Sequence, residues 1–193
     1  MAQNQCKMEV LVPIADGFEE VEALSIVDVL RRAGANVTLA SIMGLNSPNI
    51  IKSARNVKIL TDDYFENCEN LQYDLIACPG GMPNAEHLGN HKGLIEKLKK
   101  QKQQQKWIAA ICASPYYVLQ KNGLMDGEEG TCFPGLHDKF NSKSKINERV
   151  VVSNKLITSQ GAGTSLEFSI MLVEKLFSPE KAIQLAKSMV IKR

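Results

Sequence analysis

Short apolar runs alternate along the chain with segments in which hydrophobic residues recur every three positions. Continuous apolar runs bounded by turn residues are typical of buried strands, and four such runs span residues 8–13, 36–42, 74–78 and 107–111. Between the first two, a helix is predicted by the spacing of Val21, Leu24, Val27 and Leu30. Asp16 is a candidate N-cap for this helix, and Ala33-Gly34 is expected to end it.

The second half of the chain continues the alternation of strands and helices. Helices are predicted at residues 92–106 (lysine- and glutamine-rich, and therefore expected to face solvent), 115–120, 166–177 and from Pro179 onward. Residues 150–153 and 156–159 predict two short strands, paired as a hairpin across Asn154-Lys155. Apolar strands that alternate with helices predict an α/β protein, with a mostly parallel sheet covered by helices on both faces.

Composition and charge place the chain among ordinary globular proteins. Its 193 residues, 44% hydrophobic and 23% charged, predict one domain over residues 1–193. The formal net charge of +2 gives no reason to expect nucleic acid or an anionic membrane as a partner. The apolar run at 10–14 is too short for a signal core or a membrane span.

The cysteines and histidines do not form a metal-binding pattern. The five cysteines include no CxxC pair, and the three histidines are scattered, so we predict no metal site and no disulfide framework. Reduced thiols in a cytosol-like compartment, and hence a cytoplasmic location, are the expectation.

Three loops are expected to meet at one edge of the sheet. In open parallel sheets, ligands bind beyond the carboxyl ends of the strands. Residues 15–22, 79–83 and 112–115 follow three of the predicted strands and therefore lie at that edge. Candidate chemistry is sought in these loops.

Cys112 is the first candidate, because it stands between a strand and a helix that begins near Pro115. A side chain at such a turn is lifted above the sheet edge, as in a nucleophile elbow. Free backbone amides at a helix start stabilise a thiolate. The alternative is a buried structural thiol, an interpretation that this position makes less favoured than it is for an arbitrary cysteine.

Glu22 is the second candidate, because it lies next to the apolar stripe of the first helix. A carboxyl group near a core has its pKa raised by burial and stays protonated. A protonated Glu22 donates to a Cys112 thiolate and then moves protons. The alternative is an exposed acid in the first helical turn, favoured there by the helix dipole.

Two glycine-containing turns are the remaining candidate functional features. Gly80-Gly81 follows a strand, where backbone amides approach a ligand closely and form an oxyanion hole, although PGG is also an ordinary turn. The run from Gly161 to Thr164 lacks the lysine of a phosphate-binding loop and predicts a tight turn into a helix.

Four segments together resemble one family. VPIADGFEEVEALSIVDVLRRAGANVTLAS, DLIACPGGMPNAEHL, WIAAICASP and LITSQGAGTSLEFSIMLVEKL are similar, in this order, to consecutive signatures of the ThiJ/PfpI superfamily. The similarity covers about residues 7–193 and is to the branch that contains the parkinsonism-associated protein deglycase. It implies a flavodoxin-like α/β sandwich and a homodimer, with the helix at 21–32 as the interface element.

The resemblance also implies residue roles. Cys112 is implied as the reactive cysteine, and Glu22, the third glutamate of an EExE pattern, as its protonated partner. Gly81 and Ala113 are implied to supply oxyanion-hole amides. The residues expected at the pocket are Gly80, Arg55, Phe133 and Gly161, of which Arg55 matches the family arginine near the pocket mouth.

Two departures from the family pattern affect the chemistry. Protease-like members carry a histidine directly after the cysteine, where this chain has Ala113, which argues against a peptidase. Close relatives often carry a histidine where this chain has Phe133, so Glu22 is expected to do more of the proton transfer. His137 is a candidate substitute for that histidine. Cys132 is either a resolving thiol for Cys112 or a passive one.

The family resemblance implies cofactor-free glyoxalase chemistry on small reactive dicarbonyls or on their glycated adducts. The alternative is an oxidative-stress sensor and chaperone, in which Cys112 is oxidised to a sulfinate held by Glu22. A thiamine-precursor enzyme, which the superfamily name suggests, has no phosphate-binding motif to support it.

Overall fold

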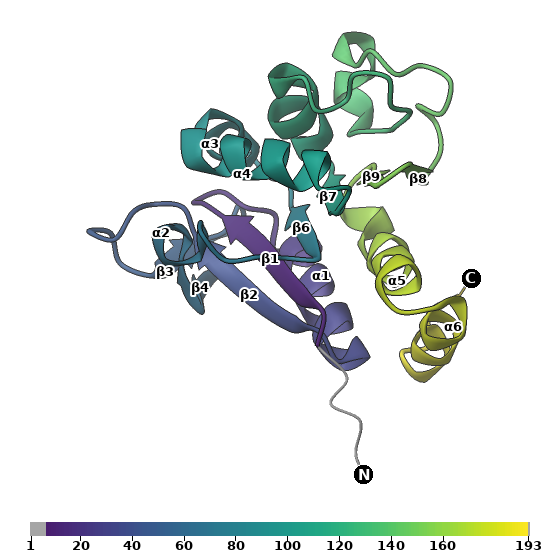
Figure 1. The fold of residues 1–193 in the computed structure, drawn as a ribbon, viewed down its shortest axis with the longest axis horizontal. Coiled ribbons are helices and arrows are strands. Elements are labelled where there is room, and N and C mark those ends of the chain that lie inside the picture. Colours follow the sequence, from purple (N-terminus) through teal and green to yellow (C-terminus); the bar gives the residue numbers. More distant parts are fainter. Residues whose placement is uncertain (1–6, 193) are drawn as a thin grey trace.

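The computed structural model describes residues 7–192, which form a central seven-stranded sheet with helices on both faces (Figure 1). The sheet order is β5-β2-β1-β6-β7-β9-β8, and β3 and β4 form a separate hairpin. The strands are β1 (Glu9–Ile14), β2 (Asn36–Ser41), β3 (Ile50–Lys52), β4 (Lys58–Leu60), β5 (Asp63–Tyr64), β6 (Leu75–Cys78), β7 (Trp107–Ile111), β8 (Val150–Ser153) and β9 (Leu156–Ser159).

The helices are of three kinds. The α-helices are α1 (Glu20–Ala33), α2 (Phe65–Cys68), α3 (Asn84–Asn90), α4 (Lys92–Gln103), α5 (Ser165–Leu176) and α6 (Pro179–Ser188). A π-helical turn, η1 (Pro115–Leu119), follows β7, and the short 3-10 turns are η2 (Gln120–Asn122), η3 (Pro134–Lys139) and η4 (Ala162–Thr164).

Every pairing in the large sheet is parallel except that of β8 with β9. The predicted α/β architecture is therefore confirmed, as is the hairpin, in which Ser153 pairs with Leu156. Because β1, β6 and β7 are parallel neighbours, their carboxyl ends lie side by side. The three loops that the sequence singled out consequently emerge at one edge.

The apolar core has two layers, one on each face of the sheet. Helices α1, α5 and α6 pack on one face, represented by Ile26, Phe168 and Leu185. Helices α3 and α4 cover the other, represented by Leu88 and Leu94 (Figure 1). The predicted solvent-facing helix at 92–106 is thus only partly so, because α4 buries one apolar side.

The start of α1 differs from the expectation. Asp16 does not cap the helix, because its Oδ1 accepts a hydrogen bond from the backbone N of Lys52 at 2.8 Å. The cap is Glu19, whose Oε2 accepts from the backbone N of Glu22 at 2.8 Å. Gly34 ends the helix in the left-handed conformation, with φ of 99°, as the sequence predicts.

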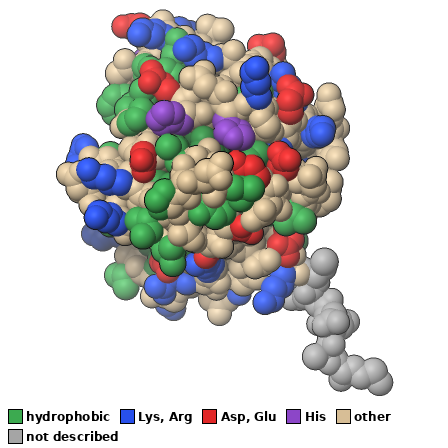
Figure 2. All heavy atoms as spheres, turned by 90° about the vertical axis from the view of Figure 1, so that its left-hand side faces the viewer, with side chains coloured by type: hydrophobic (Ala, Val, Ile, Leu, Met, Phe, Trp, Pro, Cys, Tyr) green, Lys and Arg blue, Asp and Glu red, His purple; other side chains and the backbone are tan. Residues whose placement is uncertain are grey.

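Side chains of both charge signs are scattered over the face shown in Figure 2. Hydrophobic side chains gather toward the middle and left of this face, with charged ones mostly around them. Among residues 7–192, no helix is both long enough and apolar enough to cross a membrane. Cys6 lies outside the described residues, and the four cysteines within them are unbridged.

Candidate active site

Cys112 lies at the corner between β7 and η1. Its φ of 64° is in the left-handed region, where a residue other than glycine is strained. Its backbone N donates to Ser159 O at 3.0 Å, and the buried hydroxyl of Ser114 donates to Pro79 O at 2.7 Å. These bonds fix the corner, and the Cys112 side chain remains partly exposed. The geometry is that of a nucleophile elbow.

Glu22 is completely buried in the first turn of α1, directly beside Cys112. Its Oε2 accepts a hydrogen bond from the backbone N of Gly80 at 2.7 Å. Its Oε1 has no nitrogen or oxygen partner in the described part of the chain, and the carboxyl group interacts with the Cys112 thiol. With Oε2 engaged as an acceptor, Oε1 is the atom placed to hold a proton.

The electrostatics of the pair follow from burial. Burial raises the pKa of Glu22 to about 7, against the lowering effect of the Gly80 amide. Burial also raises the pKa of the Cys112 thiol, and the negative charge of Glu22 raises it further. The backbone amides of Gly81 and Ala113 act in the opposite direction on the sulfur. The two groups therefore share a single negative charge above neutral pH.

Gly80 and Gly81 allow this close approach. A Cβ at Gly80 would lie 2.6 Å from Cys112 Cβ and 2.7 Å from Glu22 Oε2. Gly81 has a φ of 90°, and a Cβ there would lie 2.3 Å from Gly17 O. No larger residue fits at either position without moving the backbone. The PGG turn is thus built around the sulfur and the carboxyl group.

Asn84 ties two of the edge loops together, and the sequence reasoning missed it. Its Oδ1 accepts from Ala15 N at 2.7 Å, and its Nδ2 donates to Pro79 O and Gly80 O, both at 2.9 Å. The side chain is fully buried. An asparagine just after the PGG turn, at the start of α3, was the one signal for this role.

Replacing Asn84 with alanine is expected to lower the free energy of unfolding by about 2–4 kcal/mol, because it leaves buried backbone groups without partners. Urea unfolding measures this loss. The exposed Asn90 at the end of the same helix serves as the control, and Asn90→Ala is expected to change the free energy by less than about 0.5 kcal/mol. Equal stabilities for the two variants would contradict the role given to Asn84.

Gly161 and Phe133 border the outer side of the pair. A Cβ built on Gly161 would lie 3.9 Å from Cys112 Sγ, 4.0 Å from Glu22 Oε1 and 3.8 Å from Phe133 Cδ2. The Phe133 ring is 47% exposed, and its backbone N donates to Cys112 O at 2.7 Å. These two predicted pocket residues therefore lie together with the sulfur and the carboxyl group.

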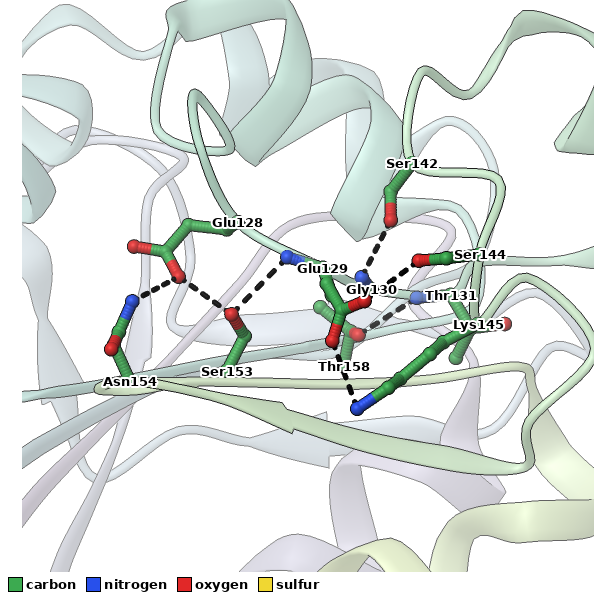
Figure 3. A network of polar contacts seen from close by, with 10 residues as sticks. All are labelled: Glu128, Glu129, Gly130, Thr131, Ser142, Ser144, Lys145, Ser153, Asn154 and Thr158. Atoms are coloured by element: carbon green, nitrogen blue, oxygen red, sulfur yellow. Dashed lines mark hydrogen bonds and ion pairs between the residues drawn. The ribbon is translucent and has the colours of Figure 1, made fainter.

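A polar network holds the loop that carries Phe133 (Figure 3). The backbone amides of residues 129–131 donate in turn to the side-chain oxygens of Ser153, Ser142 and Thr158, at 3.1, 2.9 and 2.9 Å. Two of these acceptors belong to β8 and β9. The loop is thereby fixed to the sheet two residues before Phe133.

Three other candidates make their recorded contacts with residues other than Cys112 and Glu22. The Arg55 side chain is exposed, and its Nη1 donates to Ala54 O at 3.2 Å. His137 Nε2 pairs with Cys132 O at 3.1 Å. The Cys132 side chain packs in the core layer of α3 and α4, whereas Cys112 packs against the opposite layer. The structure therefore shows no contact that favours His137 as a base or Cys132 as a resolving thiol.

The fold and the site together define an α/β protein with a cysteine on a nucleophile elbow beside a buried glutamate. Residues 8–175 match the model of the DJ-1/PfpI family, and the chain belongs to this family. The resemblance inferred from the four sequence segments is confirmed.

Relatives and solved structures agree with this assignment. The chain is 45% identical to Protein DJ-1 homolog B of Arabidopsis thaliana over 183 residues, which are 95% of this chain and 41% of that protein. The chain thus spans less than half of that relative. It is 34% identical to glutathione-independent glyoxalase DJR-1.2 of Caenorhabditis elegans, over 94% of this chain and 95% of that protein.

A solved structure of oxidized DJ-1 from Toxoplasma gondii superposes with a TM-score of 0.91. It is 42% identical, and the match covers 96% of this chain and 100% of that one. The flavodoxin-like α/β fold implied by the resemblance is therefore confirmed.

Proposed function

We propose that the chain is a cofactor-independent glyoxalase or deglycase that converts methylglyoxal-type dicarbonyls, or their glyco-adducts, to hydroxy acids. The observation that carries this proposal is the buried Glu22 carboxyl group beside the partly exposed Cys112 sulfur. A nucleophile and a proton carrier in contact are what this conversion requires. The relative named as a glutathione-independent glyoxalase supports the same chemistry.

The first step forms a carbon–sulfur bond. The Cys112 thiolate attacks the aldehyde carbon of methylglyoxal, and the carbonyl electrons move to oxygen. The amides of Gly81 and Ala113, which already point at the sulfur, stabilise the oxyanion. Glu22 then gives its proton to this oxygen, which leaves a neutral hemithioacetal and a carboxylate.

The second stage moves a proton between adjacent carbons. The Glu22 carboxylate takes the proton from the sulfur-bearing carbon, which gives an enediolate with its charge on the oxygen of the neighbouring carbon. The hydroxyl proton of the sulfur-bearing carbon moves to that oxygen, and Glu22 returns its proton to the neighbouring carbon. The product is a lactoyl thioester of Cys112. Water then attacks the thioester carbonyl, so lactate leaves and the thiolate is restored, with no net oxidation.

Lactate formed from methylglyoxal without glutathione tests the proposal. Because Glu22 approaches from one side, a single lactate enantiomer is expected. In deuterium oxide, we expect deuterium at C2, since the carboxyl proton exchanges with solvent before it is returned. Racemic lactate at the rate of the buffer alone would count against enzymatic turnover.

The pH dependence follows from the shared charge. Below pH about 7 both groups hold their protons, so no thiolate is present. Above it the pair carries one negative charge and one proton, which is the reactive form. We therefore expect kcat/KM to rise with pH through about 7 and then to level off. A decrease through this range would contradict the assignment of Glu22.

A redox sensor and chaperone is the second candidate function. The partly exposed Cys112 sulfur is accessible to peroxide, and Glu22 is placed to hydrogen-bond a sulfinate. Two equivalents of peroxide would supply the two oxygens. Mass spectrometry after peroxide treatment, with turnover measured on the same sample, separates the two functions. Rapid sulfinate formation without any lactate production favours the sensor.

We also propose a homodimer with α1 at the interface. Val21 and Leu24, on the exposed side of α1, are 50% and 41% exposed. Leu24→Asp is expected to convert the dimer to a monomer in sedimentation at micromolar concentration, because a buried charge opposes association. Ile183→Asp is the control, since Ile183 on α6 is 55% exposed but lies outside the proposed interface. A monomeric wild type would overturn the proposal.

A further inference from the structure

Glu19 joins two of the segments that build the site. Its backbone N donates to Gly80 O at 3.1 Å, and its Oε2 accepts from the backbone N of Glu22 at 2.8 Å. The backbone N of Gly80 in turn donates to Glu22 Oε2 at 2.7 Å. The three residues therefore close a ring of hydrogen bonds. Within this ring, Glu19 holds both the helical turn that carries Glu22 and the loop that carries the Gly81 amide.

The residue type at this helix cap is unusual. Serine, threonine, aspartate and asparagine are the preferred N-caps, whereas α1 is capped by the longer side chain of Glu19. A neutral side-chain oxygen at this position would also satisfy the backbone amide of Glu22. Helix capping alone therefore does not account for a glutamate here, and the effect of its negative charge on the neighbouring carboxyl group has to be considered.

The charge of Glu19 acts on one member of the reactive pair. Burial is the main cause of the raised pKa of Glu22, and the negative charge of Glu19 raises this pKa further. Besides burial, the groups that act on the pKa of the Cys112 thiol are Glu22 and the amides of Gly81 and Ala113. A charge that disfavours the Glu22 carboxylate and leaves the sulfur unaffected moves the shared negative charge toward the sulfur.

Other charged side chains at this edge of the sheet do not have this effect. They are Glu20 on α1, Arg55 between β3 and β4, Arg149 before β8 and Glu167 on α5. Arg149 and Glu167 pair with each other at 2.7 Å, and Arg55 donates to Ala54 O. Within residues 7–192, the side chains that act on the pKa of Glu22 are Cys112 and Glu19. Glu19 is therefore the one charged group outside the pair that biases it.

We infer that Glu19 is a positioning residue that directs the proton of the pair to Glu22 and the negative charge to the Cys112 sulfur. Its hydrogen bond to the Glu22 amide fixes the turn, and its carboxylate makes a second negative charge beside it unfavourable. The inference deepens the proposed function, because the nucleophilic form is a thiolate beside a carboxylic acid. It concerns the state of the sulfur before any substrate binds.

The test follows alkylation of Cys112 by iodoacetamide as a function of pH, with the labelled peptide measured by mass spectrometry. The thiolate forms a carbon–sulfur bond and iodide leaves. Glu19→Gln keeps a side-chain oxygen for the cap but removes the charge. We expect its pH of half-maximal rate to fall by about 0.5–1 unit, since ionisation of the pair becomes easier. We also expect its plateau rate to fall by about 3–10-fold, because the charge then rests on Glu22 instead of the sulfur.

Two further variants separate charge from structure. Glu19→Asp keeps the charge and supplies a preferred cap, so its pH midpoint and plateau rate are expected to stay close to those of the wild type. Glu20→Gln removes a charge from the same helical turn at a residue that does not act on the pKa of either group, and it should also match the wild type. Ultraviolet absorbance of the thiolate, taken as the difference from Cys112→Ala, should follow the same order as the plateau rates. Circular dichroism checks that each variant is folded.

Three outcomes would overturn the role of Glu19. The first is a Glu19→Gln variant with an unchanged midpoint and plateau rate. The second is a lowered midpoint with an unchanged plateau rate, which would mean that the charge acts equally on both groups. The third is a Glu19→Asp variant that behaves like Glu19→Gln, which would assign the effect to side-chain length.

The alkylation test is independent of turnover. A wild type that alkylates as expected, with the expected loss in Glu19→Gln, but that forms no lactate from methylglyoxal would refute the proposed function. The same result would leave the role of Glu19 in place. Lactate formation by the wild type, together with alkylation that Glu19→Gln leaves unchanged, would do the reverse.

Discussion

Replacing Cys112 with alanine is expected to abolish lactate formation from methylglyoxal while the protein stays folded. The substitution removes the atom that bonds to the substrate, so no hemithioacetal forms and Glu22 has no carbon-bound proton to transfer. Removing a covalent nucleophile costs at least about 10³-fold in kcat. The Cys112 side chain is partly exposed, and alanine retains its Cβ, so the elbow and its backbone bonds remain. Circular dichroism and urea unfolding check that the fold is kept.

Cys132→Ala is the matched control for this experiment. Cys132 is a second cysteine near the site in sequence, but it is fully buried in the opposite core layer. Under reducing conditions this variant is expected to keep kcat within about 3-fold of wild type, after allowance for a small loss of packing. Lactate production by Cys112→Ala at the wild-type rate would refute the covalent mechanism. A comparable loss in Cys132→Ala under the same reducing conditions would mean that Cys112 alone does not account for turnover.

The strands and the elbow could be predicted from sequence because burial on both faces leaves a strong local signal. Residues 107–111 are apolar throughout, and the break at Cys112 marks the edge of the sheet where the chain turns. The burial of Glu22 could also be predicted from sequence, because a carboxyl group beside the apolar stripe of a helix is unusual. In each case, the signal lies within one segment.

The features that could not be predicted depend on contacts between segments. Asp16 is the better cap by residue type, but the backbone amide of Lys52 in β3 engages its side chain, and Glu19 caps the helix instead. Asn84 acts on two loops distant in sequence, so its own neighbours carry little trace of its role. The β3–β4 hairpin was missed because its strands are only three residues long. The pKa of Cys112 also depends on contacts between segments. The backbone amides of Gly81 and Ala113 lower it, as expected, but burial and the negative charge of Glu22 raise it by more.

Glu22→Gln is expected to change the pH dependence of stability as strongly as it changes catalysis. The folded state raises the pKa of Glu22 from 4.5 to about 7, so between these values the native protein holds a proton that the unfolded chain has lost. Stability therefore falls as pH rises from 4.5 to 7, and the loss is complete above 7. A shift of this size corresponds to about 3 kcal/mol. Glutamine cannot ionise, so the variant avoids the loss.

Urea unfolding at pH 4 and pH 8 measures this effect. Between pH 4 and pH 8, the free energy of unfolding of Glu22→Gln is expected to rise by about 3 kcal/mol relative to that of the wild type. Glu86→Gln, at an exposed residue of α3, is the control, and its free energy of unfolding should stay within about 0.5 kcal/mol of wild type at both pH values.

The same Glu22→Gln variant should lose about 10²–10⁴-fold in lactate formation, because the proton carrier is gone. If Glu22→Gln raises the free energy of unfolding and lowers turnover, burial of the Glu22 carboxyl group destabilises the fold. Its burial is then explained by its role in proton transfer. Parallel stability curves for wild type and Glu22→Gln would mean that Glu22 ionises in the folded protein as readily as in the unfolded chain, and the mechanism built on its retained proton would fail.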